Sequence, residues 1–311
     1  MQEDKARFRV EIVAPVHNRK QITLQCLRSI GRLRTDGFDI HTVIVDDGST
    51  DGTSEAIREQ FPDVEVVRGD GNLWFTEGTN VGVRAALKHS PKYVLMINDD
   101  QVFDSDALAF MIETAEKHER SVVGSLLLLW DTPHQLFQVS PVWETRLGGW
   151  RHWYKQTVWT IPDKPWLVDV IVGNCVLVPA AAFREAGLMN SKHYPNYGDA
   201  EFTPRLAKLG WKLIIDPRAR VFCQPNNLPV KVTRSTLPEK MRMLITDVGH
   251  PHNLRRRFRA MWDSAPTKLD AVVGFSVFLG RLVLRKNVES SWMVNQDEKP
   301  LSETFKSRVV S

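Results

Sequence analysis

Acidic side chains directly follow two of the apolar runs in this sequence. An Asp-Asp-Gly-Ser turn begins at Asp46, after the run 41–45, and an Asn-Asp-Asp segment ending at Asp100 follows the run 93–97. Runs of this length that are rich in β-branched and aromatic residues predict buried strands. Carboxylates at the carboxyl end of such a strand lie where an open α/β sheet binds its ligand, and they are costly there unless cations or hydrogen-bond donors meet them. The spacing therefore predicts a ligand site.

The two acidic segments suit different parts of a ligand. A carboxylate at Asp46 or Asp47 can accept a hydrogen bond from the imide N–H of a pyrimidine base or from a ribose hydroxyl. A capped turn into the next helix would explain the Ser and Thr residues that follow, but not the two acids. Asn98, Asp99 and Asp100 offer amide and carboxylate oxygens, which are the ligands that Mg²⁺ and Mn²⁺ prefer.

Strand and helix patterns alternate along the first two thirds of the chain. Strands are expected at 10–14, 41–45, 64–67, 93–97, 122–129, 168–178 and 211–215, and helices at 19–33, 53–60, 78–88, 107–117, 180–186 and 201–209. This alternation is typical of an α/β fold with a mostly parallel sheet that has helices on both faces. Near residue 225 the pattern changes. We therefore expect a catalytic domain over 1–225 and a basic, mainly helical C-terminal region over 226–311.

The bulk composition is that of an ordinary globular protein. The chain has 311 residues, of which 42% are hydrophobic and 25% charged, and its net charge is +4. The charged N-terminus lacks the apolar core of a signal peptide, and the longest apolar stretch, 271–279, is too short to span a bilayer. Three cysteines lie far apart without pairing or zinc-like spacing, which favours buried free thiols in a reducing compartment. We expect a cytoplasmic protein.

Basic and apolar residues mix between 254 and 286, where arginines are frequent. This composition suits an interfacial helix that docks on anionic lipid at the inner face of the plasma membrane. It suits equally a helical cap that packs on the domain or on a second subunit in a homodimer. The sequence leaves both interpretations open.

Tryptophan is concentrated between residues 130 and 166, which hold six of the ten tryptophans. The segment could form a hydrophobic flap buried on the sheet. Interleaved arginine, histidine and lysine also suit stacking on a sugar with phosphate contact. On the second interpretation Trp150 and Trp153 are candidates for binding an acceptor.

Six segments, taken in order along the chain, resemble family 2 glycosyltransferases with a GT-A fold. The first runs from Val13 to Arg19 and the second is the turn that begins at Asp46. Residues 71–82 are similar to the element that closes over the nucleotide, and 98–100 lie where the family has its Asp-x-Asp motif. Segments 173–175 and 197–202 resemble the acceptor side with its catalytic acid. The similarity covers roughly residues 8–224.

The resemblance implies an inverting transferase that uses a nucleotide-diphosphate sugar. It implies Asp100 as the ligand of a divalent cation, Mn²⁺ or Mg²⁺, and Asp199 as the general base that deprotonates an acceptor hydroxyl. Glu201 is the rival base, although it could instead pair with Arg205. Asn174 falls on the acceptor side. The residues placed along the nucleotide sugar are Pro15, His17, Asn18, Asp46, Asp47, Trp74, Asn80, Asn98 and Asp99.

The sequence departs from the family pattern at two places. Asn98 replaces the usual first Asp of the metal motif, so only Asp100 is a confident charged ligand there. A metal-binding histidine is common about 25 residues beyond the base, but here Cys223 and Gln224 occupy that stretch. The cation is therefore expected to bind weakly, unless His250 or His252 supplies a ligand.

Together these features predict transfer of a sugar to a glycan or polyprenyl-linked acceptor in bacterial surface polysaccharide synthesis. The donor is expected to be a UDP- or dTDP-sugar, with rhamnose and galactofuranose as candidates by resemblance. No nucleic-acid partner is expected. A nucleotidyltransferase is one alternative, but it would usually open with a glycine-rich phosphate loop, which residues 14–18 lack. A catalytically silent scaffold that binds glycans or membrane is the other.

Overall fold

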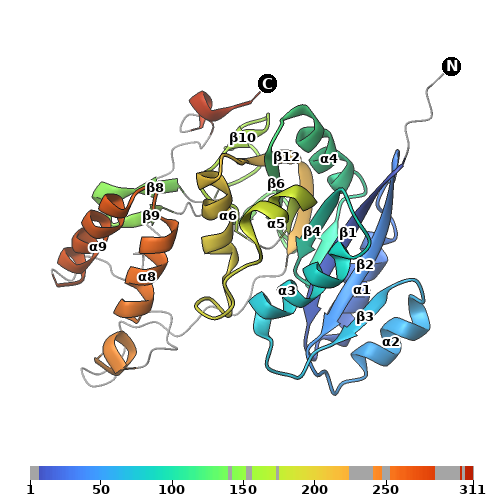
Figure 1. The fold of residues 1–311 in the computed structure, drawn as a ribbon. Coiled ribbons are helices and arrows are strands. Elements are labelled where there is room, and N and C mark those ends of the chain that lie inside the picture. Colours follow the sequence, from blue (N-terminus) through green and yellow to red (C-terminus); the bar gives the residue numbers. More distant parts are fainter. Residues whose placement is uncertain are drawn as a thin grey trace.

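The computed structural model describes residues 7–138, 142–151, 156–172, 175–223, 241–246, 253–283, 302 and 305–310, and all structural statements below concern these residues. They form a layered α/β body with a smaller helical region on one side (Figure 1). One large sheet of ten strands has the order β10-β12-β6-β11-β4-β1-β2-β3, with β5 paired to β12 and β7 to β6.

The strands of this sheet are mostly short and apolar. Their bounds are β1 (Phe8–Val16), β2 (Phe38–Asp46), β3 (Glu65–Arg68), β4 (Tyr93–Ile97), β5 (Gln101–Phe103), β6 (Ser121–Leu129), β7 (Leu136–Gln138), β10 (Trp166–Leu167), β11 (Cys175–Pro179) and β12 (Lys212–Cys223). Strands β3, β2, β1 and β4 are parallel, as are β6 and β12. Strand β11 runs antiparallel between β4 and β6, so the sheet is mixed where the sequence predicted a mostly parallel one.

Helices cover both faces of the sheet, as predicted. One face packs against α1 (Lys20–Ile30), α2 (Thr53–Gln60) and α4 (Ala107–Lys117), and the other against α3 (Trp74–Leu87), α5 (Ala180–Ala186) and α6 (Asp199–Lys208). Helix α3 lies unusually close to β1. A Cβ at Gly82 would stand 2.3 Å from Val13 Cγ1, and one at Gly78 would stand 2.8 Å from Pro15 Cβ. Only glycine at these positions lets the helix approach the strand so closely.

Several boundaries differ from the prediction for physical reasons. Helix α3 begins at Trp74 rather than at 78, because Asp47 accepts hydrogen bonds from its first N–H groups. The predicted strand 168–178 is a strand only from Cys175 onward. Strand β12 continues to Cys223 through an irregularity between Asp216 and Arg220, where its register against β6 shifts.

The C-terminal region packs on the tryptophan-rich segment and on α6. Helix α8 (Leu254–Ser264) packs beside α6, and α9 (Lys268–Val283) packs on α8, away from β2 and β3 (Figure 1). Helix α9 contacts the short helix η1 (Thr145–Leu147) and β9 (Gly149–Arg151), which pairs with β8 (Val142–Glu144). A π-helical turn, η3 (Arg242–Thr246), precedes α8, and η5 (Lys306–Arg308) lies two residues before the end of the described chain. The boundary predicted near 225 falls between described segments and stays a prediction.

Candidate active site

Both acids of the turn after β2 accept hydrogen bonds from backbone N–H groups. Asp46 accepts from the Ser49 N–H at 2.8 Å and from the Ser54 hydroxyl. Asp47 accepts from the N–H groups of Gly71 at 2.8 Å, Leu73 at 2.9 Å and Trp74 at 3.2 Å. Both side chains are buried. They therefore fix the loop that leads into α3, on the edge of the sheet where the sequence placed the nucleotide.

The loop after β1 is locked onto the same turn. His17 Nδ1 lies 2.6 Å from the Asp47 carbonyl oxygen, so this nitrogen carries the proton and donates. Asn18 adopts a left-handed backbone with φ of +52°, and its Oδ1 accepts from the Thr50 N–H at 2.8 Å. Both side chains are exposed, whereas Pro15 is half-buried beneath α3. The two loops form one surface at the carboxyl ends of β1 and β2.

Trp74 stands at the start of α3 in a conformation that tryptophan rarely adopts. Its φ is +57°, and 62% of its side chain is exposed. A bulky residue with positive φ is held only when its surroundings overdetermine it, and such strain is concentrated at ligand sites. Here the hydrogen bond from the Trp74 N–H to Asp47 fixes it. The indole is thus presented to solvent beside the two loops.

Arg19 bridges the two acids that follow β4. Its Nη1 donates to Asp99 at 2.8 Å and its Nη2 to Asp100 at 3.1 Å. Thr23 donates to the second oxygen of Asp99 at 3.0 Å. Burial raises the pKa of Asp99 to about 6, although Arg19 opposes this shift. Sequence reasoning assigned no role to Arg19; its place directly after Asn18, at the end of a strand, was the available signal.

Cys223 lies beside the acidic pair, in the stretch where the family commonly has a histidine. Strand β5 pairs with β12 so that Cys223 stands opposite Gln101. Burial, and next the charge of Asp100, raise the pKa of the Cys223 thiol well above its usual value. A buried neutral thiol is a poor ligand for Mg²⁺ or Mn²⁺, which prefer oxygen. Gln224, His250 and His252 lie outside the described residues.

The N-terminus of α6 is tied to the N-terminus of α3. Thr76 accepts from the Gly198 N–H at 3.0 Å and donates to the carbonyl of Tyr194. The Asn80 amide exchanges two hydrogen bonds with the Met189 backbone, at 2.9 and 3.1 Å. Asn80 thus holds the loop that leads into α6, whereas the sequence placed it along the donor. These contacts bring Asp199, the first residue of α6, to the donor-side helix.

The two candidate bases have different surroundings. Glu201 is bound in a bidentate pair by Arg205, whose Nε and Nη2 donate at 2.6 and 3.2 Å. Arg205 also donates to the backbone carbonyls of Ala186 and Leu188. Asp199 is buried in the first turn of the helix, where the peptide dipoles favour a carboxylate. Glu201 is therefore committed to an ion pair, the alternative role that the sequence had left open.

Trp150 contacts the C-terminal helices. Its indole N–H donates to the Ser264 hydroxyl at 3.0 Å, and its ring meets Trp143 edge to face at 5.1 Å. The side chain is buried. The burial of Trp150 agrees with the hydrophobic-flap alternative, but the side chain packs on the C-terminal helices rather than on the sheet. Acceptor contact by Trp150 stays a prediction. Trp153 and Asn174, the other acceptor candidates, lie outside the described residues, so their roles stay predictions.

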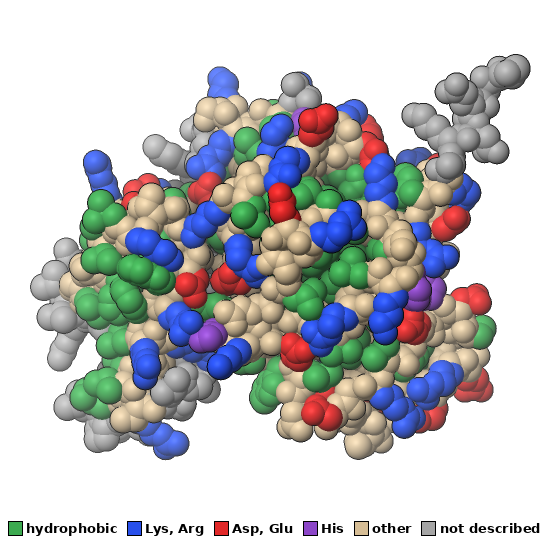
Figure 2. Space-filling view, in the orientation of Figure 1, with side chains coloured by type: hydrophobic (Ala, Val, Ile, Leu, Met, Phe, Trp, Pro, Cys, Tyr) green, Lys and Arg blue, Asp and Glu red, His purple; other side chains and the backbone are tan. Residues whose placement is uncertain are grey.

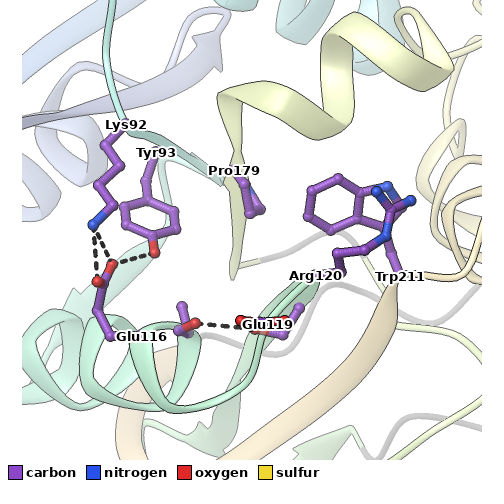
Figure 3. A pocket seen from close by; sticks show the side chains of 9 residues that line it. Lys92, Tyr93, Glu116, Glu119, Arg120, Pro179 and Trp211 are labelled. Carbon is purple, nitrogen blue, oxygen red and sulfur yellow. Dashed lines mark hydrogen bonds and ion pairs between the residues drawn. The ribbon is translucent and has the colours of Figure 1, made fainter.

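A surface cavity of about 380 Å³ lies at the other end of the sheet (Figure 3). Its lining includes Lys92 and Tyr93 at the start of β4, both of which bond Glu116. Arg120 lies over the ring of Trp211. The donor-side residues lie instead at the carboxyl ends of the strands, so this cavity is no part of the candidate active site.

The fold is similar to that of solved glycosyltransferases of the GT-A type. Among solved structures, S. aureus TarS has a TM-score of 0.56 at 12% identity, with 91% of this chain and 45% of that chain covered. GalNAc-T7, solved with UDP, GalNAc and Mn²⁺, has a TM-score of 0.57 at 13% identity and covers 89% and 57%. At these identities the likeness shows the fold.

The sequence comparison supports the predicted family resemblance. Residues 11–141, less than half of the chain, match the family described as glycosyl transferase family 2. The N-acetylglucosaminyl-diphospho-decaprenol L-rhamnosyltransferase of Mycobacterium tuberculosis is 23% identical over 205 residues. The match covers 58% of this chain and 66% of that relative, just under two thirds of its length. The resemblance to this family and the GT-A fold, both predicted from the sequence, are confirmed.

Proposed function

We propose that this protein is an inverting transferase that moves a sugar from a UDP- or dTDP-sugar to a hydroxyl of a glycan or polyprenyl-linked acceptor. The observation that supports this best is the placement of Asp199. It begins a helix whose start is bonded to the donor-side helix α3, while its neighbour Glu201 is held by Arg205. An inverting mechanism needs one carboxylate that takes the proton of the acceptor hydroxyl, and we assign this role to Asp199.

The proposed reaction is one displacement. Asp199 takes the proton of the acceptor hydroxyl as the acceptor oxygen forms its bond to the anomeric carbon. The bond between that carbon and the diphosphate oxygen breaks, and its electron pair leaves with the diphosphate. Because attack comes from the face opposite the leaving group, the configuration at the anomeric carbon inverts.

The departing diphosphate needs positive charge. Arg19 supplies a guanidinium near the carboxyl end of β1. The side chain of Arg19 is 36% exposed. The carboxylates of Asp99 and Asp100 also suit Mg²⁺ or Mn²⁺, which commonly bind one or two carboxylates and the phosphates of the substrate. Such a cation would stabilise charge on the leaving group. The cation must share the two carboxylates with Arg19 or displace it, because the guanidinium already binds one oxygen of each acid.

The names of the relatives support a choice of acceptor and donor. A mycobacterial relative is named as a rhamnosyltransferase acting on a diphospho-decaprenol-linked sugar, and a structural neighbour was solved with UDP-GlcNAc. We therefore favour a lipid-linked acceptor of bacterial surface polysaccharide synthesis and place rhamnose first among donor sugars. No described helix is long and apolar enough to cross a membrane. A cytoplasmic site of action at the inner face of the plasma membrane, and a homodimer, are further parts of this proposal.

The decisive experiment measures nucleotide diphosphate release from a panel of UDP- and dTDP-sugars, with and without Mn²⁺, and with and without an acceptor sugar linked to polyprenyl diphosphate. Asp199→Asn should lower turnover by about 10²–10⁴ with donor affinity nearly unchanged. Asp63→Asn, on the exposed segment between α2 and β3, is the matched control and should behave as wild type. Wild-type turnover in Asp199→Asn together with an inactive Glu201→Gln would assign the base to Glu201. Release of a sugar 1-phosphate instead of the nucleotide diphosphate would identify a nucleotidyltransferase, and binding without any turnover would identify a scaffold.

A further inference from the structure

A second cluster of ligating side chains lies away from the donor edge, under the far end of α3. Glu11 of β1 meets two histidines: His41 Nδ1 lies 2.7 Å from Oε2, and His89 Nδ1 lies 3.1 Å from Oε1. One ligating atom from each of the three residues lies within 4.8 Å of the others. Glu11 precedes the end of β1 by five residues, so the cluster is about 16 Å from the donor edge along the strand.

The parallel sheet creates this cluster from distant parts of the sequence. Glu11 and His41 are register partners on β1 and β2, and both face α3, as Val13 and Val43 do on the same strands. His89 follows Lys88, the C-cap of α3. The C-terminal end of a helix carries partial negative charge and favours a cation.

Glu11 is costly where it stands unless positive charge meets it. None of its surface is exposed, and it sits within a central strand of the sheet. A buried carboxylate is tolerated when it is paired or when it binds a metal ion. Each of its oxygens is directed at a different imidazole nitrogen.

The surroundings of His89 supply a further sign of a metal site. Its second ring nitrogen, Nε2, lies 3.7 Å from a carboxylate oxygen of Glu65 on β3. Histidines that bind a metal usually direct their other ring nitrogen at a carboxylate or carbonyl, which fixes the ring and strengthens the ligand. Glu65 is placed for this supporting role.

We propose that Glu11, His41 and His89 form a binding site for a divalent transition-metal ion of the Zn²⁺ class, which fastens the C-terminal end of α3 to β1 and β2. Two imidazoles and one carboxylate are a ligand set that suits Zn²⁺ and does not suit Mg²⁺. An ion of this class is held at roughly 2.0–2.2 Å, so the ligand atoms, which lie within 4.8 Å of one another, would have to move closer together around it. The side chains of His41 and His89 are 28% and 29% exposed, so an ion can enter from solvent.

The test uses the full chain stripped of metal with a chelator and titrated with Zn²⁺ by calorimetry. It is done in an Asp100→Ala background, which removes the acid proposed for the donor-side cation. We expect one Zn²⁺ per chain, with Mn²⁺ binding far more weakly. His89→Gln should lower Zn²⁺ affinity at least about tenfold, as loss of one ligand does. His118→Gln is the matched control, because His118 also follows a helix, α4, and is half-buried.

Two results would overturn the proposal. One is the absence of Zn²⁺ binding, which would leave a hydrogen-bonded His–Glu–His group that only neutralises Glu11. The other is binding that His89→Gln leaves unchanged. Should a variant fail to fold, electron paramagnetic resonance of Cu²⁺ bound to the wild-type chain decides the question, because two imidazole ligands give nitrogen couplings and their absence excludes this site. The outcome is independent of the transfer assay, since none of the three residues lies at the donor edge.

Discussion

At the scale of single residues, the donor edge depends on carboxylates that already have partners. Asp46 and Asp47 bind backbone N–H groups, and Arg19 binds Asp99 and Asp100. The sequence correctly placed these acids at strand ends, but it could not reveal their partners. The Arg19–Asp99 pair spans 80 residues, and only the parallel order of β1 and β4 brings its members together.

Replacing Arg19 with glutamine should expose competition between the guanidinium and a metal ion. Two buried carboxylates would lose their charge partner, which should cost on the order of 2 kcal/mol of stability. Mn²⁺ should then raise the melting temperature of Arg19→Gln more than that of the wild type, and it should do nothing for Arg19→Gln combined with Asp100→Ala. Thermal unfolding with and without Mn²⁺ measures this. Equal responses of wild type and Arg19→Gln would show that no ion uses these oxygens.

The pKa of Asp99 gives stability a specific pH dependence. Because burial raises this pKa to about 6, the folded chain binds more protons than the unfolded chain, whose Asp pKa is about 3.9. The contribution of Asp99 is therefore fully present below about pH 4 and is lost as pH rises through about 6. Urea unfolding from pH 4 to 7 should show this fall in wild type, and Asp99→Asn should lack it. Asp51, whose pKa is lowered chiefly by its bond from Thr53, should contribute with the opposite sign.

At the scale of elements, α3 connects the two sites proposed for this chain. Its first residues bond Asp47 and the loop before α6, and the residue after its C-cap contacts Glu11. Sequence periodicity found the helix but started it four residues late, since the start depends on Asp47, 27 residues earlier. The three-residue strand β5 was missed for the same reason: it forms only because β12 extends alongside it.

The strained start of α3 can be tested at Trp74. Trp74→Gly and Trp74→Ala both remove the indole, but only glycine adopts a φ of +57° without strain. Trp74→Gly should therefore be more stable than Trp74→Ala by about 1–2 kcal/mol, as measured by urea unfolding. If the base of the donor stacks on the indole, both variants should lose about 1–3 kcal/mol of binding to the nucleotide diphosphate in calorimetry. Unequal loss of binding would point to the backbone rather than the indole.

At the scale of the whole molecule, the C-terminal arginines divide into two groups. Arg257 is buried against the ring of Phe278 at 3.7 Å, and burial lowers its pKa to about 9. Arg256 lies over the ring of Tyr197. These two support the packing interpretation, whereas Arg255 and Arg259 are exposed. A composition count could not separate them, because the division depends on which face of α8 meets α6 and α9.

Membrane contact is tested on the exposed face of α9. Hydrophobic side chains gather on this side of the molecule (Figure 2), and they include Leu269 at 72% exposure, Val272 and Val273. If this face docks on lipid, the chain should co-sediment with anionic vesicles, and Leu269→Glu with Val273→Glu should abolish that binding. Arg255→Glu with Arg259→Glu should weaken it in a salt-dependent way. Replacing Arg256 or Arg257 is unsuitable here because it would also disturb packing. If the chain forms a dimer that Leu269→Glu with Val273→Glu dissociates, this face contacts a second subunit instead.

The last described residues return to the outer strand of the sheet. Val309 pairs with Trp166 on β10, the Val310 N–H donates to the Pro165 carbonyl at 2.9 Å, and Phe305 is buried against the Trp166 ring. A protein shortened at residue 225 to isolate the catalytic domain would thus lose the cover of an edge strand and expose an otherwise fully buried indole. Such uncovered edges recruit other chains. The shortened enzyme should form inclusion bodies, even though every acid at the donor edge would still be present.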